Sequence, residues 1–141
     1  RSGEEPTGNA RAINYRFPPI VRMRTTCIGQ GASSLAEMMD GIKTGIYVSG
    51  GYGGETNGEM FTFTASRCRM IRNGALAEPV RDVSLTGNVF TTLRNIDMIG
   101  NDFQVRNTGG GCGKGAQSPL PTTEGSPHIR IRKVVVGGEK Q

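Results

Sequence analysis

The chain has 141 residues, of which 35% are hydrophobic, and its formal net charge at pH 7 is +5. This length suffices for one domain with its own core, and no apolar run reaches the roughly 20 residues that a membrane-spanning helix needs. The 17 Lys and Arg residues are scattered apart from Arg130, Arg132 and Lys133, and aromatic residues make up 6% of the chain. Because single-strand nucleic-acid binding combines basic grooves with stacked aromatic rings, the composition argues against that function.

Glycine and proline interrupt the chain often, with 22 Gly and 7 Pro residues, which favours short strands over long helices. Cys27, Cys68 and Cys112 form neither a Cys-x-x-Cys metal hook nor an even-numbered disulfide framework. We therefore expect reduced thiols and a cytoplasmic location. Residues 1–19 are polar and end in Pro18-Pro19, so we interpret them as an extended linker before a domain that covers residues 20–141.

The first strand is predicted at residues 20–27, where alternation places Val21 and Met23 on an apolar side and Cys27 in the packing. A helix is predicted after it, because Ser34-Leu35-Ala36-Glu37 is a capping box. We expect this helix to end at Gly45. Its apolar stripe consists of Leu35, Met38, Met39 and Ile42.

A short strand at Ile46-Tyr47-Val48 is predicted to lead into a glycine-rich loop at residues 50–54, which a substrate could approach closely or which is a plain flexible turn. The apolar phase then slips after Ala65, which predicts a β-bulge near Ser66-Arg67.

The strongest hairpin signal is Asn73-Gly74, because a type I′ turn needs positive φ at both central positions. The returning strand carries Pro79, which predicts an edge strand or a bulge. Asn88 is a candidate cap for a short helix through Leu93, and residues 128–136 predict one closing strand. These features together predict a mainly β (α+β) fold class, with a curved antiparallel barrel-like or sandwich-like sheet and one or two short helices.

The segment with the clearest chemistry is Gly109-Gly110-Gly111-Cys112-Gly113-Lys114-Gly115-Ala116-Gln117. Glycines can turn backbone N–H groups toward one point, and Lys114 adds a positive charge, so both would favour a thiolate at Cys112. A thiolate at a loop tip can be a metal ligand, a nucleophile or a redox group, and a merely exposed or packed cysteine remains an alternative.

Two rival interpretations of this loop fit less well. A phosphate-binding P-loop fails because Thr108 stands where the first glycine is needed and Gly115 follows Lys114. A cysteine nucleophile needs a base, and His128, the one histidine of the chain, could reach Cys112 only through tertiary folding. A zinc site normally needs three or four protein ligands, which this chain alone cannot supply.

The chain resembles the TldD-type subunit of the TldD/TldE (PmbA) metallopeptidases, also called modulators of DNA gyrase. The similarity runs from about Gly8 to Gly138 and includes Cys112-Gly113-Lys114 with Gln117, which is the TldD-type pattern, whereas Ala116 replaces the family's usual glycine. The other matching blocks are Gly8-Asn9-Ala10-Arg11, Pro19-Ile20-Val21-Arg22-Met23, Gly41 to Val48, Ile71-Arg72-Asn73-Gly74, Pro79-Val80-Arg81, Leu85-Thr86-Gly87-Asn88, Gly100-Asn101-Asp102 and Val136-Gly137-Gly138.

This resemblance implies a zinc endopeptidase that acts on unfolded peptides. It implies that Cys112 is the third protein ligand of the zinc ion, and that a His-Glu-x-x-x-His helix upstream of this segment supplies two imidazoles and a general base. It also implies a TldE/PmbA-like partner subunit in a heterodimer, or self-association. We expect that the 141-residue chain by itself binds no zinc and is inactive.

The candidate substrate-binding residues are Gly109, Gly110, Gly111, Asn101 and Asp102. Glycine loops could let an unfolded peptide pair through its backbone as an added strand. The alternative function is a non-catalytic binding or assembly module, either a degenerate subunit or a basic β-domain that contacts nucleic acid.

Overall fold

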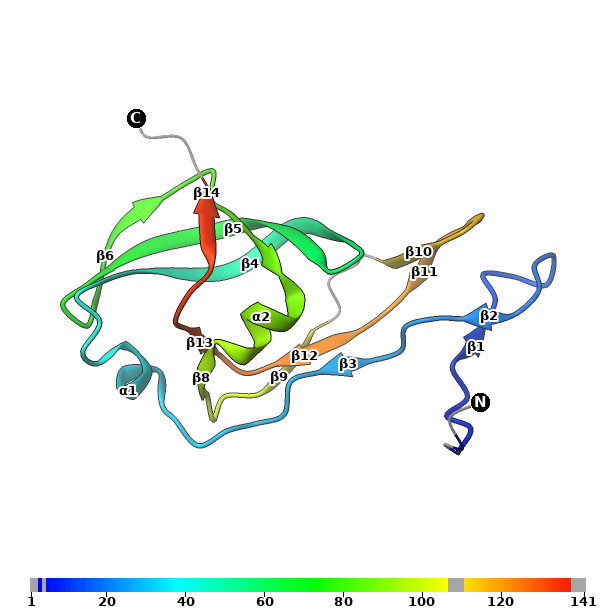
Figure 1. Cartoon of the computed structure of the whole chain (residues 1–141), viewed down its shortest axis with the longest axis horizontal. Helices are drawn as coiled ribbons and strands as arrows, with labels where there is room; N and C mark the ends of the chain where they lie inside the picture. Colours follow the sequence, from blue (N-terminus) through cyan, green and yellow to red (C-terminus); the bar gives the residue numbers. More distant parts are fainter. Residues whose placement is uncertain (1–2, 4, 107–110, 138–141) are drawn as a thin grey trace. The chain divides into compact units, whose positions relative to one another are not determined.

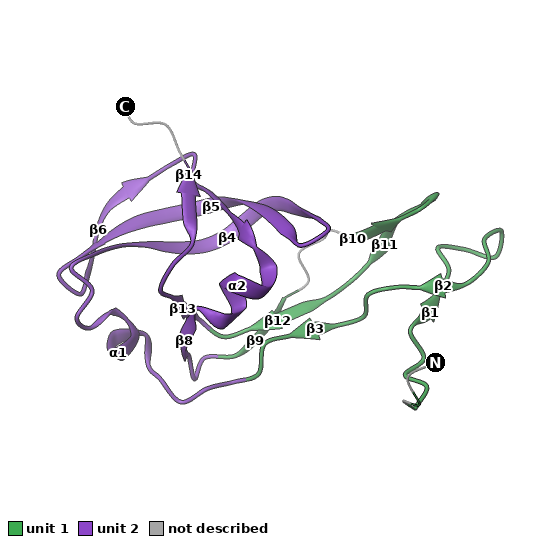
Figure 2. Ribbon diagram, in the orientation of Figure 1, with its two compact units in different colours: residues 1–29, 103–127 green, residues 30–102, 128–141 purple. Residues whose placement is uncertain are grey.

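The computed structural model describes residues 3, 5–106 and 111–137, and this part of the chain is mainly β with two short helices (Figure 1). The predicted fold class is therefore confirmed. The described strands form five sheets, which end on free edge strands and do not close into a barrel. Contacts divide the chain into a first unit, Arg1–Gly29 with Phe103–Pro127, and a second unit, Gln30–Asp102 with His128–Gln141 (Figure 2). Each described sheet lies within one unit.

The main sheet of the second unit is built on two long antiparallel strands, β4 (Thr44–Asn57) and β5 (Met60–Arg72). Because β4 occupies one edge of β5 along its length, two shorter strands share the other edge. The first half of β5 pairs with β7 (Ser84–Asn88), and the second half pairs with β6 (Ala75–Val80). The sheet continues from β7 to β14 (Val135–Gly137).

The turn between β5 and β6 confirms the predicted hairpin. Asn73 and Gly74 have φ values of 48° and 78°, and Arg72 pairs with Ala75 across the turn. Positive φ at both central residues is the type I′ geometry that suits the twist of a hairpin. Pro79 lies in β6, which pairs with β5 alone in the described sheet, so the predicted edge position is also confirmed.

Both predicted helix starts are confirmed, but the first helix is shorter than expected. In α1 (Leu35–Met39) the Ser34 hydroxyl accepts from Glu37 N, and the Glu37 carboxylate accepts from Ser34 N. The chain leaves this helix at Gly41, where φ is 72°, rather than at Gly45, which lies in β4. In α2 (Val89–Arg94), the Asn88 side chain caps the first turn as predicted.

The glycine-rich segment at residues 50–54 is part of β4, so the prediction of a loop was wrong. A Cβ at Gly51 would lie 2.4 Å from Cε2 of Phe63, and glycine therefore lets the Phe63 ring lie against the strand. The register of β4 shifts between Gly51 and Gly53, and that of β6 against β5 shifts between Arg69 and Ile71. The bulge predicted near Ser66-Arg67 is displaced, because Arg67 and Ala65 keep regular partners in β4. The register shift lies opposite Ala65 and Thr64, and the extra residue is on β4.

The core of the second unit lies against β5. Ala65, Cys68 and Val83 are buried and pack with partly buried residues, and burial raises the pKa of the Cys68 thiol. The packed neighbours are Ile46, Val48, Phe63, Val80 and Leu85. Residues 128–136 do not form one strand as predicted. They form β13 (Ile129–Ile131), paired with β8 (Ile96–Ile99), and then β14 in the main sheet.

The first unit consists of short strands in three small sheets. β1 (Ala10–Arg11) pairs with β2 (Ile20–Val21), and β10 (Gly111–Lys114) pairs with β11 (Gln117–Pro121). In the third sheet, β12 (Glu124–Ser126) lies between β3 (Thr26–Cys27) and β9 (Gln104–Arg106).

The predicted single strand over residues 20–27 is therefore wrong, because the chain leaves β2 after Val21 and enters β3 at Thr26. The predicted sidedness is reversed as well, since Val21 and Met23 are 64% and 43% exposed while Arg22 is 2% exposed. Cys27 is exposed rather than packed. A two-stranded sheet such as β1–β2 has no broad face that packs against a core. Alternation of apolar and polar residues in this segment therefore does not indicate which side chains are buried.

Candidate functional site

Cys112 lies in a β-hairpin rather than at a loop tip, which corrects the sequence-based prediction. It belongs to β10 and pairs with Leu120 of β11, a residue that is 5% exposed. Lys114 pairs with Gln117 across a two-residue turn in which Gly115 has a φ of 57°. Positive φ at the first central residue alone is typical of a type II′ turn, which accepts Ala116 at the second position.

The Cys112 thiol is available for a ligand. The residue is half-buried and not in a disulfide, and among the described residues its Sγ makes one weak contact, a 3.9 Å donation to the carbonyl of Gly113. The ammonium group of Lys114 donates to the carbonyl of Val21 at 2.8 Å, so this charge is directed at the backbone of β2. The backbone of Cys112 is held in turn by Arg22, whose Nη2 donates to the Cys112 carbonyl oxygen.

Gln117 fixes the start of the chain against this hairpin. Its side chain is buried, with 3% of the residue exposed. Oε1 accepts from the backbone N–H of Ile13 at 2.9 Å, and Nε2 donates to the carbonyl of Pro18 at 3.0 Å. One amide thus satisfies a donor and an acceptor at the two ends of the same connection between β1 and β2.

The glycines before Cys112 divide between described and undescribed residues. Gly109 and Gly110 lie outside the described residues. Gly111 is described, and a Cβ at this position would lie 2.8 Å from the Leu120 carbonyl oxygen and 2.9 Å from Cβ of Pro119. The absence of a side chain at Gly111 therefore allows the close approach of β10 to β11.

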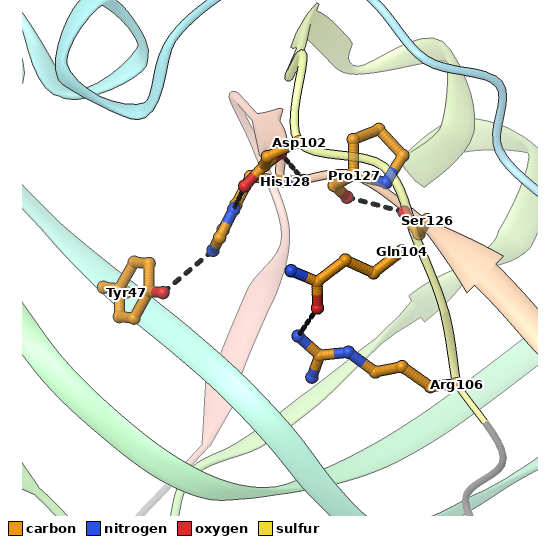
Figure 3. A network of polar contacts seen from close by, with 7 residues as sticks. All are labelled: Tyr47, Asp102, Gln104, Arg106, Ser126, Pro127 and His128. Carbon is orange, nitrogen blue, oxygen red and sulfur yellow. Dashed lines mark hydrogen bonds and ion pairs between the residues drawn. The ribbon is translucent and has the colours of Figure 1, made fainter.

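In the second unit, Asp102 belongs to a polar chain that also contains His128 and Tyr47 (Figure 3). Asp102 Oδ1 accepts from the backbone N–H of His128 at 3.0 Å, and Oδ2 contacts the ring atom Nδ1. The other ring nitrogen, Nε2, lies 2.8 Å from the Tyr47 hydroxyl, and the two rings stack with centroids 5.5 Å apart. Asn101 is exposed, and its backbone N–H donates to the carbonyl of Ser33.

Asp102 determines the donor and acceptor atoms of this polar chain. The backbone and ring N–H donors of His128 hold the pKa of the Asp102 carboxyl below its usual range. An ionised Asp102 places the hydrogen of a neutral imidazole on Nδ1, which leaves Nε2 to accept from Tyr47. Both ring nitrogens of His128 are therefore engaged, and the geometry does not support this histidine as the base of a Cys–His pair.

The predicted basic cluster is partly neutralised. Arg130 donates to both carboxylate oxygens of Asp97, at 2.9 and 2.7 Å, and Arg132 donates to Oδ2 at 2.7 Å. These two guanidinium groups hold the pKa of the Asp97 carboxyl far below its usual range, and the hydrogen bonds from Arg130 have the largest effect. Arginines that are committed to a carboxylate are poor evidence for a nucleic-acid surface.

Among the described residues, no group of three or more His, Cys, Asp and Glu side chains could hold a metal ion. None of the helices in the described ranges is long and apolar enough to cross a membrane.

The described residues are mainly β, and the free thiol of Cys112 lies in the hairpin of β10 and β11. The chain belongs to the family described as PmbA/TldA metallopeptidase C-terminal domain, whose match covers residues 1–138. The TldD-type resemblance found in the sequence is thus confirmed at the level of the family.

Curated relatives agree with this assignment. The chain is 58% identical over 137 residues to a metalloprotease of Synechocystis sp., covering 97% of this chain and 29% of that protein. It is 39% identical over 137 residues to a zinc metalloprotease TldD homolog of Saccharolobus solfataricus, covering 96% of this chain and 30% of that protein. The chain thus spans under a third of the length of these two relatives.

The structure of TldE from Thermococcus kodakarensis matches with a TM-score of 0.72 and 23% identity, covering 96% of this chain and 28% of that chain. At this identity the match shows the fold alone.

Sequence reasoning missed Arg22 and the contacts of Gln117. A period-two pattern treats every arginine as exposed and therefore gives no sign that Arg22 is buried. A usable signal was nevertheless present, since Arg22 and Gln117 both lie in blocks that match the family.

Proposed function

We propose that this chain is the C-terminal part of a zinc-dependent endopeptidase that acts on unfolded peptides, and that Cys112 is one of its zinc ligands. The observation that carries the proposal is the free, half-buried thiol of Cys112, held in a hairpin whose backbone two side chains fix. Membership of a metallopeptidase family supports the reaction class.

The residues present fit one ligand of a zinc site. A thiolate is a good zinc ligand, and a catalytic zinc takes three protein ligands and keeps one open position. We assign the other protein ligands to two histidines of a His-Glu-x-x-x-His segment in the full-length protein. When bound, the zinc ion would polarise the scissile carbonyl and lower the pKa of a bound water to about 7.

The residues of this chain would hold and shape the site. The position of the Cys112 thiolate would be set by β10 and by the hydrogen bonds of Arg22 and Lys114 that hold this strand. The nearby backbone would contact the peptide. We assign this second role to Gly109, Gly110 and Gly111. Asn101 and Asp102 are proposed separately, as substrate-binding residues of the second unit. Because both Asp102 oxygens already contact His128, the exposed Asn101 is the freer polar group of the last two.

We further propose a TldE-like partner subunit or self-association, and a cytoplasmic location. The similarity of the fold to a TldE structure supports the first, and three free cysteines support the second. The alternative function is a non-catalytic binding or assembly module. It treats Cys112, which is half-buried and not in a disulfide, as an ordinary free thiol.

The two functions are separated by zinc content and peptide cleavage in the full-length protein, with its partner subunit present. Cys112→Ser should lose zinc and cleavage of an unfolded peptide together. Cys27→Ser is the matched control, because Cys27 is also a free cysteine of the first unit and should tolerate the change. Full zinc and activity in Cys112→Ser would contradict the ligand assignment, and a wild-type protein without zinc or cleavage would favour the assembly module.

A further inference from the structure

We propose that Arg22 is a positioning residue for Cys112, which holds the backbone of the hairpin so that the thiolate meets the metal. The inference rests on the proposed function, because it takes Cys112 as a zinc ligand. Arg22 is 2% exposed and donates through Nη2 to the Cys112 carbonyl oxygen, across 90 residues of sequence.

The placement of Arg22 is unfavourable for stability by itself. Within the described residues, its Nε and Nη1 atoms are buried without a hydrogen-bond partner. Buried charged donors without partners are destabilising, and an apolar side chain of similar volume in place of a buried charge is often neutral or stabilising. Folding alone therefore does not explain an arginine at this position, whereas a requirement to fix Cys112 does.

A second contact fixes the same part of the hairpin from the adjacent residue. The Lys114 ammonium donates to the Val21 carbonyl at 2.8 Å. Residues 21–22 and the hairpin thus each donate one hydrogen bond to the backbone of the other. Strand β10 has β11 as its one partner strand in the described sheet. These two hydrogen bonds therefore restrain β10 more than its pairing with β11 does alone.

The position of the thiol depends on this restraint. Within the described ranges, the side chain of Cys112 makes a single weak contact of its own at 3.9 Å, so we take the location of Sγ to follow from the backbone. A zinc–thiolate bond is about 2.3 Å long, and displacement of the strand by a fraction of an ångström would weaken it. Groups that orient metal ligands typically change metal affinity by about 10- to 100-fold when they are removed.

Arg22 also lines a pocket of about 370 Å³ with Arg24 and with uncharged residues, so a competing explanation is that it binds an acidic ligand there. The remaining lining residues are Asn9, Met23, Thr25 and Thr26. Arg24 separates the two explanations. It lines the same pocket and carries the same charge, but it is exposed and donates to the Thr7 carbonyl rather than to the hairpin.

The test is zinc affinity of the full-length protein, measured by competition with a chromophoric chelator, for Arg22→Met, Arg22→Lys and Arg24→Met. We expect zinc dissociation constants raised about 10- to 100-fold in Arg22→Met, raised less in Arg22→Lys, and within about twofold of wild type in Arg24→Met. Thermal unfolding of the metal-free Arg22→Met protein should match or exceed that of wild type.

Other outcomes overturn the inference. Wild-type zinc affinity in Arg22→Met and Arg22→Lys would show that Arg22 does not position the ligand, and failure of Arg22→Met to fold would show a structural role instead. Equal losses in Arg22→Met and Arg24→Met would favour the pocket explanation. Cys112→Ser identifies the separate failure of the proposed function, since retained zinc affinity in that variant would remove Cys112 from the site whatever Arg22 does.

Discussion

Asp102 accepts two hydrogen bonds from His128, one from the backbone N–H to Oδ1 at 3.0 Å and one from the ring atom Nδ1 to Oδ2. The pair joins the turn after β8 to the start of β13, and the Tyr47 hydroxyl at 2.8 Å from Nε2 extends it to β4. Three segments that are far apart in the sequence therefore meet at one imidazole.

Asp102→Asn should destabilise the chain by about 1–2 kcal/mol. An amide has one acceptor oxygen, so its NH2 group would face one of the two N–H donors of His128. Urea unfolding followed by circular dichroism measures the change. Asn101→Ala is the matched control at the adjacent, exposed position and should stay within about 0.5 kcal/mol of wild type. An equal loss in the two variants would mean that the turn, rather than the pair, is responsible.

The Asp97–Arg130 pair should make stability depend on pH in the acid range. The pKa of the Asp97 carboxyl is lower in the folded chain than in the unfolded chain. The contribution of ionised Asp97 to the free energy of unfolding is therefore complete above the unfolded pKa of about 4, and it is lost progressively as the pH falls from there toward the folded pKa. Asp97→Asn should cost about 1–3 kcal/mol at pH 7, and its difference from wild type should narrow progressively below about pH 4. Denaturant unfolding at several pH values measures this.

Asp82→Asn provides the control for that series. Asp82 forms a 3.5 Å pair with Arg81, and both side chains are largely exposed. Asparagine also tolerates the positive φ of 58° at this position. Its difference from wild type should stay within about 0.5 kcal/mol at every pH. If the difference in unfolding free energy between wild type and Asp97→Asn did not narrow in acid, the result would contradict the assigned ion pair.

The features predicted correctly from the sequence are those that local chemistry determines. The Ser34 capping box, the Asn73-Gly74 turn and the Asn88 cap each satisfy backbone groups within a few residues. A short window of sequence therefore contains the whole interaction. The mainly β class follows for the same reason, since frequent turns exclude long helices.

The features that sequence reasoning missed depend on partners far along the chain. The glycines of β4 look like a loop until the Phe63 ring that needs the space is placed opposite Gly51. Arg22 looks exposed until the Cys112 carbonyl is brought to it. The assignment of Cys112 as a candidate ligand came from the family resemblance, because the surrounding glycines alone did not distinguish a ligand from an ordinary thiol.

Gly51→Ala should destabilise the second unit by about 1–3 kcal/mol, because the added Cβ would overlap the Phe63 ring. Gly29→Ala is the control, since a Cβ there has nothing within 4 Å and φ is not positive. Thermal unfolding measures both variants. Phe63→Leu should cost less in the Gly51→Ala background than in wild type, and strict additivity of the two changes would contradict the proposed overlap.

Gln117→Leu should loosen the connection between β1 and β2, because it leaves the Ile13 N–H and the Pro18 carbonyl without their partner. We expect a loss of about 1–3 kcal/mol and faster trypsin cleavage after the exposed Arg16. Gln104→Leu replaces an exposed glutamine of the first unit and should leave the cleavage rate unchanged. Unchanged cleavage in Gln117→Leu would show that other contacts hold this connection.

The proposed binding of the catalytic metal by the Cys112 thiolate can be observed in the absorption spectrum of the cobalt-substituted full-length protein. Wild type and Cys27→Ser should both show a thiolate-to-cobalt charge-transfer band in the near ultraviolet, and Cys112→Ser should lose it. A band that persists in Cys112→Ser, or that is missing from a wild-type protein loaded with stoichiometric cobalt, would contradict the claim.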